Sequence, residues 1–161
     1  MNLYIRLSFA LLLLLALAAC EKEPPPPVST GDGTYEKLTR HSWQLIEAYT
    51  NSKKDGVLTT ENHYANMDSC EMDDLITFNT DSNAIVVDQG KNKCYPGEPQ
   101  TFVSQKWALN GESYVAYFDI GTENMYEAAI IELSETTYHI RRYGTLTDGT
   151  YFETTHRYVA R

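Results

Sequence analysis

The chain has 161 residues, a formal net charge of −9 and 12% aromatic residues, among which tyrosine is the commonest. Phosphates repel a chain this acidic, and its basic residues are scattered, so nucleic acid is excluded as an expected partner. The aromatic content excludes a largely disordered chain, and the length suits one domain with a real core.

The first 19 residues have the layout of a secretory signal peptide. Arg6 precedes an apolar segment, residues 7–19, which only Ser8 interrupts and which ends in small residues before Cys20. This segment is too short to cross a bilayer, and a charged, proline-rich stretch follows it. Cleavage before Cys20 would leave a mature chain with a net charge of −10, since Arg6 is the one charged residue removed.

Residues 17–20, Leu-Ala-Ala-Cys, resemble the end of bacterial lipoprotein signal peptides, which are cut before a cysteine that is then acylated. The resemblance implies a lipidated Cys20 that joins the protein to the membrane; the alternative is an ordinary signal peptide with a chance cysteine. Residues 20–33 include Pro24 to Pro27 and are expected to form an extended tether. Residues 21–23, Glu-Lys-Glu, resemble the charged signals that send some lipoproteins to the cell surface, so we expect an outer-membrane location facing the periplasm or the cell surface.

Two further cysteines, Cys70 and Cys94, remain after the anchor. In the oxidising compartment expected for an exported domain, a pair of thiols predicts a disulfide before a metal site or a nucleophile. A loop of this length stabilises the fold by about 3 kcal/mol in the chain-entropy model. The alternative is two free thiols.

The domain of residues 34–161 is predicted to be all-β after one short helical turn. Residues 34–40 suit that turn, with Thr34 as a candidate N-cap. From Trp43 onward, short runs rich in β-branched and aromatic residues alternate with polar or glycine-containing turns, and no long helical period occurs. Eight strands are expected, at residues 43–50, 75–79, 84–89, 102–109, 114–120, 126–133, 137–143 and 151–159.

The tight connections between these strands predict an antiparallel meander. Eight such strands can close into an up-and-down β-barrel, and the open alternative is a β-sandwich. Two longer connections, residues 51–74 and 90–101, carry Cys70 and Cys94 respectively. A disulfide would therefore tie these connections across one end of the barrel, where a ligand mouth is expected.

Several features resemble the lipocalin-like domain of Gram-negative lipoproteins over about residues 36–161. They are Trp43 with Leu45, the group of Cys70, Asp73, Asp74 and Phe78, Cys94, residues 107–109 and residues 130–134. The lipocalin signature has a glycine two residues before its first-strand tryptophan, whereas this chain has His41. The resemblance implies a small calyx-like barrel with a lipid anchor and a binding function. It also implies that Trp43 is a structural plug at the closed end, beneath Arg157 or Arg161 of the last strand.

Strand alternation gives candidate ligand contacts. If the faces that carry them point inward, a few polar groups interrupt an apolar and aromatic wall, as in a binding cavity. The candidates are Glu127, Ala129, Tyr138, Arg142, His156 and Tyr158. The alternative for Glu127 and Arg142 is a structural ion pair at the rim.

The sequence carries no recognised catalytic motif, and its four histidines are dispersed. Asp68, Glu71, Asp73 and Asp74 lack the spacing and glycine of a calcium loop, so we expect no metal, no cofactor and no enzymatic activity. Two functions remain. The protein binds a small apolar or amphiphilic ligand, or it is an interaction module with a filled barrel, whose acidic loops or edge near Tyr114 and Tyr117 contact another envelope protein.

Overall fold

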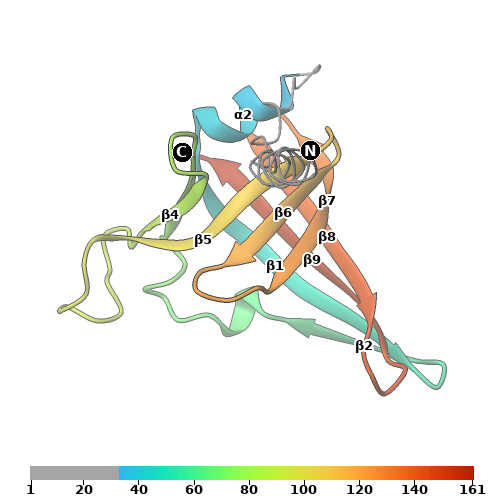
Figure 1. Cartoon of the computed structure of the whole chain (residues 1–161). Coiled ribbons are helices and arrows are strands. Elements are labelled where there is room, and N and C mark those ends of the chain that lie inside the picture. Colours follow the sequence, from blue (N-terminus) through green and yellow to red (C-terminus); the bar gives the residue numbers. More distant parts are fainter. Residues whose placement is uncertain (1–32) are drawn as a thin grey trace, which may run out of the picture.

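The computed structural model describes residues 33–161, so the predictions for the signal peptide, Cys20 and the proline-rich segment lie outside the described residues. The described residues contain one α-helix, one 3-10 turn and nine strands (Figure 1). They are α2 (Thr34–Arg40), β1 (Ser42–Lys54), β2 (Val57–Asn62), η1 (Tyr64–Asn66), β3 (Leu75–Asn79), β4 (Ala84–Asp88), β5 (Thr101–Asn110), β6 (Tyr114–Asp119), β7 (Met125–Leu133), β8 (Thr137–Thr145) and β9 (Tyr151–Ala160).

The strands form a closed, antiparallel barrel. Their order is β2-β1-β3-β4-β5-β6-β7-β8-β9, and β1 also pairs with β9 along most of its length. The eight strands other than β2 make the barrel, and each corresponds to one of the predicted strands. The predicted eight-stranded up-and-down barrel is confirmed, and the sandwich alternative is wrong because the β1–β9 pairing closes the sheet.

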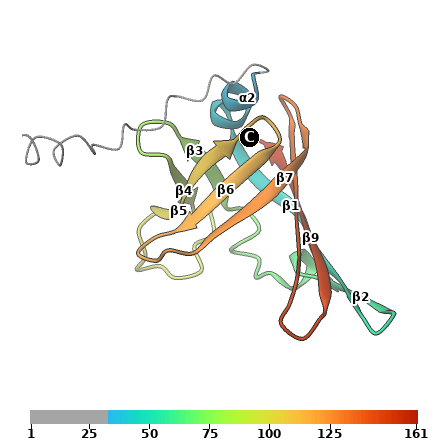
Figure 2. The ribbon, with the colours of Figure 1, turned by 45° about the vertical axis from the view of Figure 1, so that its right-hand side comes forward.

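Strand β2 was not predicted from the sequence. β1 continues to Lys54, turns at Asp55 and Gly56, which have φ angles of 49° and 82°, and returns as β2. This two-residue turn with positive φ at both positions is the usual connection of a tight hairpin. The β1–β2 hairpin projects beyond the barrel beside the β8–β9 hairpin (Figure 2). The region of residues 51–62 is therefore a hairpin and not a loop.

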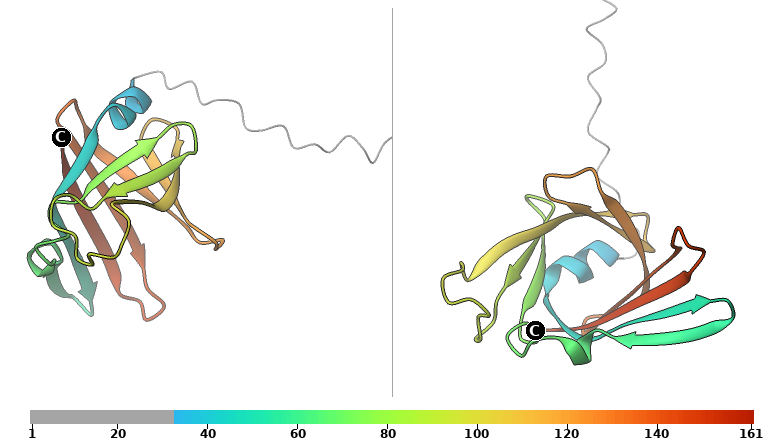
Figure 3. Two further views of the ribbon diagram at one scale, coloured as in Figure 1. Left: turned by 90° about the vertical axis from the view of Figure 1, so that its left-hand side faces the viewer. Right: turned by 90° about the horizontal axis from the view of Figure 1, so that it is seen from below.

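Helix α2 covers one end of the barrel (Figure 3). Leu38 of the helix and Trp43 of β1 are fully buried, and the indole Nε1–H of Trp43 donates a hydrogen bond of 2.9 Å to the carbonyl oxygen of Leu38. The helix is capped by Gly33, at φ 67°, and not by the side chain of the predicted Thr34, which is the first helical residue. Trp43 therefore lies at the closed end of the barrel, under the helix. The arginines predicted to lie above it have other partners: Arg157 pairs with Glu47 at 3.7 Å, and the Nε–H of Arg161 donates to Gln44 at 2.6 Å.

An aromatic core fills the half of the barrel next to α2. Phe78 meets Trp107 and Tyr138 edge to face, with ring centroids 5.2 and 5.7 Å apart. The hydroxyl groups of Tyr117 and Tyr138 lie 2.7 Å apart, and both side chains are buried. Pairing the two hydroxyls satisfies polar groups that would otherwise be costly in an apolar core.

The predicted disulfide is confirmed: Cys70 and Cys94 are bonded, with their Cα atoms 5.1 Å apart. It joins the segment before β3 to the segment after β4, at the end of the barrel away from α2 (Figure 3). The Asp73 carboxylate accepts hydrogen bonds from the backbone N–H groups of Lys91 and Asn92, at 2.8 and 3.2 Å. The two loops are therefore held together by both the disulfide and hydrogen bonds.

Candidate functional site

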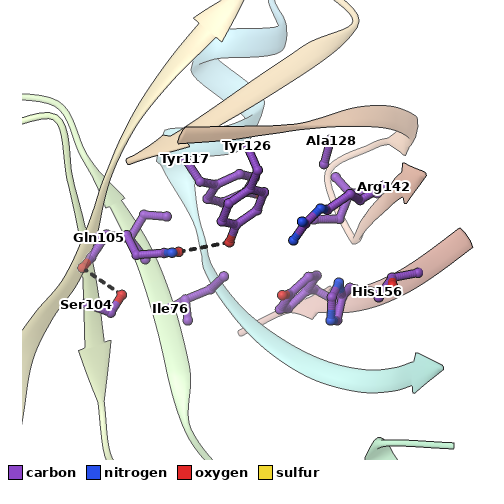
Figure 4. A pocket seen from close by; sticks show the side chains of 12 residues that line it. Ile76, Ser104, Gln105, Tyr117, Tyr126, Ala128, Arg142 and His156 are labelled. Carbon is purple, nitrogen blue, oxygen red and sulfur yellow. Dashed lines mark hydrogen bonds between the residues drawn. The ribbon is translucent and has the colours of Figure 1, made fainter. Parts of the chain in front are cut away.

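A cavity of about 230 Å³ lies between the aromatic core and the open end of the barrel (Figure 4). Seven strands contribute to its wall, which is apolar and aromatic with a few polar groups. The lining residues are Ile76, Ile85, Ser104, Gln105, Tyr117, Tyr126, Ala128, Ile140, Arg142, Thr154, His156 and Tyr158. The barrel is thus filled at one end and hollow at the other.

Three of the six candidate ligand contacts line this cavity: Arg142, His156 and Tyr158. Their orientation follows from the β8–β9 ladder. It runs from the Thr137–Val159 pair to the Thr145–Tyr151 pair without a register shift, so side chains alternate strictly along both strands. Tyr138 faces the interior as expected but lies deeper, fully buried, with its ring 5.4 Å from that of Tyr158. It supports the cavity wall and does not line the cavity.

The expectation that Glu127 and Ala129 face the interior is wrong. Tyr126 and Ala128 are the inward residues of this part of β7, whereas Glu127 is exposed and accepts a hydrogen bond of 2.6 Å from Asn110 Nδ2–H. A β-bulge between Ile130 and Glu132 adds a residue to β7, so residues on its two sides do not share one alternation. Alternation counted back from the inward Leu133 therefore selects the wrong face.

Arg142 carries the only permanent charge in the cavity wall. Its guanidinium carbon lies 4.7 Å from the centroid of the Tyr126 ring and 5.6 Å from that of Phe152, as in cation–π contacts. The neighbouring Arg141 is paired with Glu153 at 3.5 Å. The ion pairs among residues 33–161 do not include Arg142, so the predicted alternative of a rim pair with Glu127 is not formed. An unneutralised cation thus stands beside an aromatic cavity.

Polar groups in the wall are oriented by their neighbours. The Tyr126 hydroxyl donates to Gln105 Oε1 at 3.2 Å, and Gln105 Nε2–H donates to Asp119 Oδ1 at 3.0 Å. These bonds hold the Tyr126 ring against Arg142. Neither Tyr126 nor Gln105 was predicted as a site residue. No sequence signal could have found them, because Tyr126 is placed by its pairing opposite the buried Tyr117 in the β6–β7 ladder, a register that only the structure shows.

The surroundings of His156 favour its neutral form at pH 7. Burial lowers its pKa, and the nearby His63 and Arg142 lower it further. A hydrogen-bonded chain lies beside it, in which Thr50 Oγ1 is 2.9 Å from Thr154 Oγ1 and 2.8 Å from His63 Nε2. Burial also raises the pKa of Tyr158, so its hydroxyl stays protonated. His156 and Tyr158 therefore present neutral polar edges, and Arg142 alone supplies charge.

Asp74, in the acidic loop near the disulfide, has a pKa well above that of an ordinary aspartate. Burial, followed by the charges of Asp73, Glu71 and Asp88, raises the pKa of Asp74 from 3.8 to about 6. The folded state thus disfavours the ionised carboxylate that prevails at neutral pH. Among residues 33–161 no group of three or more His, Cys, Asp or Glu side chains is arranged to hold a metal ion.

Replacing Asp74 with asparagine is expected to stabilise the fold at pH 7.5 by about 1 kcal/mol, after solvent screening of this partly exposed group is allowed for. Because the folded pKa is raised, the wild type loses stability as the pH rises from 3.8 through 6, and the variant avoids that loss. Urea unfolding at pH 7.5 and pH 3.5 measures the effect. The gain should vanish at pH 3.5, and an equal gain at both pH values would contradict the assignment.

No protein-family model and no curated protein matches this sequence. The closed eight-stranded barrel is compatible with a lipocalin-like fold. None of the helices among residues 33–161 is long and apolar enough to span a bilayer. The functional argument therefore depends on the cavity and its residues.

Proposed function

We propose that this protein binds a small organic anion with an apolar or aromatic body inside its barrel, as a lipid-anchored, non-enzymatic protein of the outer membrane. The observation that carries the proposal is Arg142, a cation without an ion-pair partner among residues 33–161 at the rim of an aromatic cavity. An anionic group at Arg142 would leave the apolar body of the ligand among Ile85, Tyr117 and Ile140. A few polar groups in an apolar wall are typical of small-molecule sites.

The volume limits the size of the ligand. The cavity of about 230 Å³ lies below the range of roughly 300–1,000 Å³ for drug-sized ligands and above the ~150 Å³ of an engineered cavity that holds benzene. One ring or a short branched chain fits this space. The lining residues are mostly apolar or aromatic, with one cation and a few neutral polar groups, which supports binding of an anionic, largely apolar ligand.

The arrangement of the chain supports an anchored binding protein. Gly33 and α2 lie at the closed end of the barrel (Figure 3). The residues that line the cavity lie toward the other end. A tether that ends at Gly33 would hold the protein by its closed end and leave the mouth accessible from solution. No cofactor is required by this proposal.

Methyl phenyl phosphate, a monoanion with one aromatic ring, is a suitable probe of the cavity. We expect Arg142→Gln to weaken its binding about tenfold or more, since a hydrogen bond to a charged group contributes about 1.5–3 kcal/mol. Ala128→Trp should weaken binding at least as much, because Ala128 is 2% exposed and its side chain faces the cavity. Isothermal titration calorimetry on the full-length protein in mild detergent measures both effects.

Arg141→Gln is the matched control for Arg142→Gln. Arg141 adjoins Arg142 in sequence but pairs with Glu153 and does not line the interior cavity, so its replacement should change the affinity less than about twofold. Failure of the wild type to bind the probe, or equal losses in the two arginine variants, would contradict the proposed site. Native mass spectrometry of protein purified from its own membranes would then show whether any small molecule is bound.

The lipid anchor is a separate part of the proposal, supported by the Leu-Ala-Ala-Cys sequence at residues 17–20. Cys20→Ser should abolish metabolic labelling with radioactive palmitate and release the protein from the membrane fraction. A conservative control is Ser29→Ala, which leaves the cleavage sequence unchanged and should retain the label. Palmitate incorporation into the Cys20→Ser protein would contradict lipidation at this residue.

A second function, an interaction module, is favoured by β2. All six residues of this strand are exposed, and β2 pairs with β1 on one edge only. A free strand edge can accept a strand of another protein. Of the surface predicted for such contacts, Tyr114 is 38% exposed but Tyr117 is only 5% exposed, so the predicted edge near Tyr117 is wrong. Absence of ligand binding in the experiment above would favour this second function.

A further inference from the structure

Strands β7 and β8 separate halfway along the barrel wall. Their last paired residues toward the open end are Ala129 and Arg141. Beyond this point residues 125–128 of β7 pair only with β6, and residues 142–145 of β8 pair only with β9. Figure 2 shows β7 diverging from the β8–β9 hairpin toward the end away from α2. We call this unpaired part of the β7–β8 junction the seam.

A recess of about 340 Å³ lies on the outside of the barrel along the seam. Tyr114, Met125, Ala129 and Tyr143 contribute to its lining. Met125 and Tyr143 are 56% and 55% exposed, and together with Tyr114 they make a contiguous apolar and aromatic patch. The recess thus offers apolar and aromatic surface on the outer side of the seam.

Tyr126 and Arg142 line both the interior cavity and the outer recess. They stand on opposite sides of the seam, Tyr126 on β7 and Arg142 on β8, and they touch through their cation–π contact at 4.7 Å. In Figure 4 the Arg142 side chain lies beside the Tyr126 ring, above His156. The two compartments therefore share a boundary at which the positive charge of Arg142 is available from either side.

We propose that the seam and the outer recess form a second subsite, and that the ligand is a monoanion flanked by two apolar or aromatic arms, such as a phosphodiester. The anion lies at Arg142, one arm enters the cavity and the other arm lies in the recess against Tyr114 and Tyr143. This inference rests on the proposed function and names its ligand class. It explains why the cation lies at the junction of two apolar compartments and not at the end of one.

The charges around the recess favour a monoanion. Arg141 contributes to the lining and is paired with Glu153, and Glu127 contributes a carboxylate that accepts a hydrogen bond from Asn110. A second negative charge on the ligand would be repelled by Glu127, which lies on the recess side of β7. An uncharged arm meets no such repulsion.

Two probes with the same charge separate the subsites. Methyl phenyl phosphate has one aromatic arm, and diphenyl phosphate has two. We expect wild-type protein to bind diphenyl phosphate about tenfold more tightly than methyl phenyl phosphate. An additional aromatic pair stabilises a complex by an amount of this order, over and above the effect of the buried area. Isothermal titration calorimetry on the full-length protein compares the two probes.

Adjacent alanines provide matched variants, since Ala128 faces the cavity and Ala129 faces the recess. Ala129→Trp should erase the advantage of diphenyl phosphate and leave methyl phenyl phosphate within about twofold of wild type, whereas Ala128→Trp should weaken both probes. Tyr143→Ala, at an exposed position, provides a second recess variant with the same expectation as Ala129→Trp. Equal affinities of the two probes for the wild type, or an advantage that persists in both recess variants, would overturn the second subsite. If methyl phenyl phosphate does not bind the wild type at all, the proposed function itself fails.

Discussion

Replacing Trp43 with alanine is expected to lower the free energy of unfolding by about 4 kcal/mol, the largest effect that the structure predicts for a single side chain. Trp43 is fully buried between α2 and the aromatic core, and its ring lies 5.6 Å from that of Tyr138. Removing it leaves a cavity the size of an indole. It also removes the hydrogen bond that the carbonyl oxygen of Leu38 accepts from the indole N–H in the wild type. The closed end of the barrel would lose its packing contact with the helix.

Trp43→Phe separates packing from hydrogen bonding. Phenylalanine retains an aromatic ring but lacks the N–H donor, so the expected loss is about 1–2 kcal/mol. Urea unfolding of both variants, followed by the change in far-ultraviolet circular dichroism, gives the two values. A loss below about 1.5 kcal/mol for Trp43→Ala would show that the helix and core repack around the space, and that Trp43 does not close the barrel in the way its burial indicates.

The barrel was predictable from the sequence because its strands carry apolar alternation and its connections carry turn residues. β8 and β9 also gave correct site residues: their ladder has no register shift, so alternation placed Arg142, His156 and Tyr158 on the inner face. In β7 the extra residue at the bulge after Ile130 puts both Ala128 and Leu133 on the inner face, so Ala129 faces outward. A bulge leaves no strong mark in a sequence, since it inserts one ordinary residue.

Two other features depend on information that a sequence pattern does not contain. Strand β2 has both faces exposed, so it lacks the apolar alternation by which strands are recognised, and only Asp55-Gly56 signals its hairpin. The volume of the cavity depends on how the side chains of seven strands pack. The sequence shows neither that Trp43, Phe78 and Tyr138 fill one half of the barrel nor that Arg142 lies over Tyr126 at the seam.

Removing the disulfide with the double variant Cys70→Ala, Cys94→Ala is expected to cost about 3 kcal/mol of stability. The bond closes a loop with a sequence separation of 24 residues, and its main effect in the chain-entropy model is to restrict the unfolded chain. The folded loops should change little, because Asp73 still accepts the backbone N–H groups of Lys91 and Asn92 and β3 still pairs with β4. The double variant should therefore lose stability but keep its affinity for the ligand.

The effect of the disulfide on stability can be measured with the wild type, the double variant and a reductant. Wild type unfolded in urea with dithiothreitol should match the double variant, and the variant should be insensitive to the reductant. The affinity for methyl phenyl phosphate should stay within about threefold of wild type, because the cavity residues Ile76 and Ile85 are held by the five residue pairs of the β3–β4 ladder and not by the disulfide. A large loss of affinity in fully folded variant protein would mean that the tethered loops, and not the strands alone, shape the mouth of the cavity.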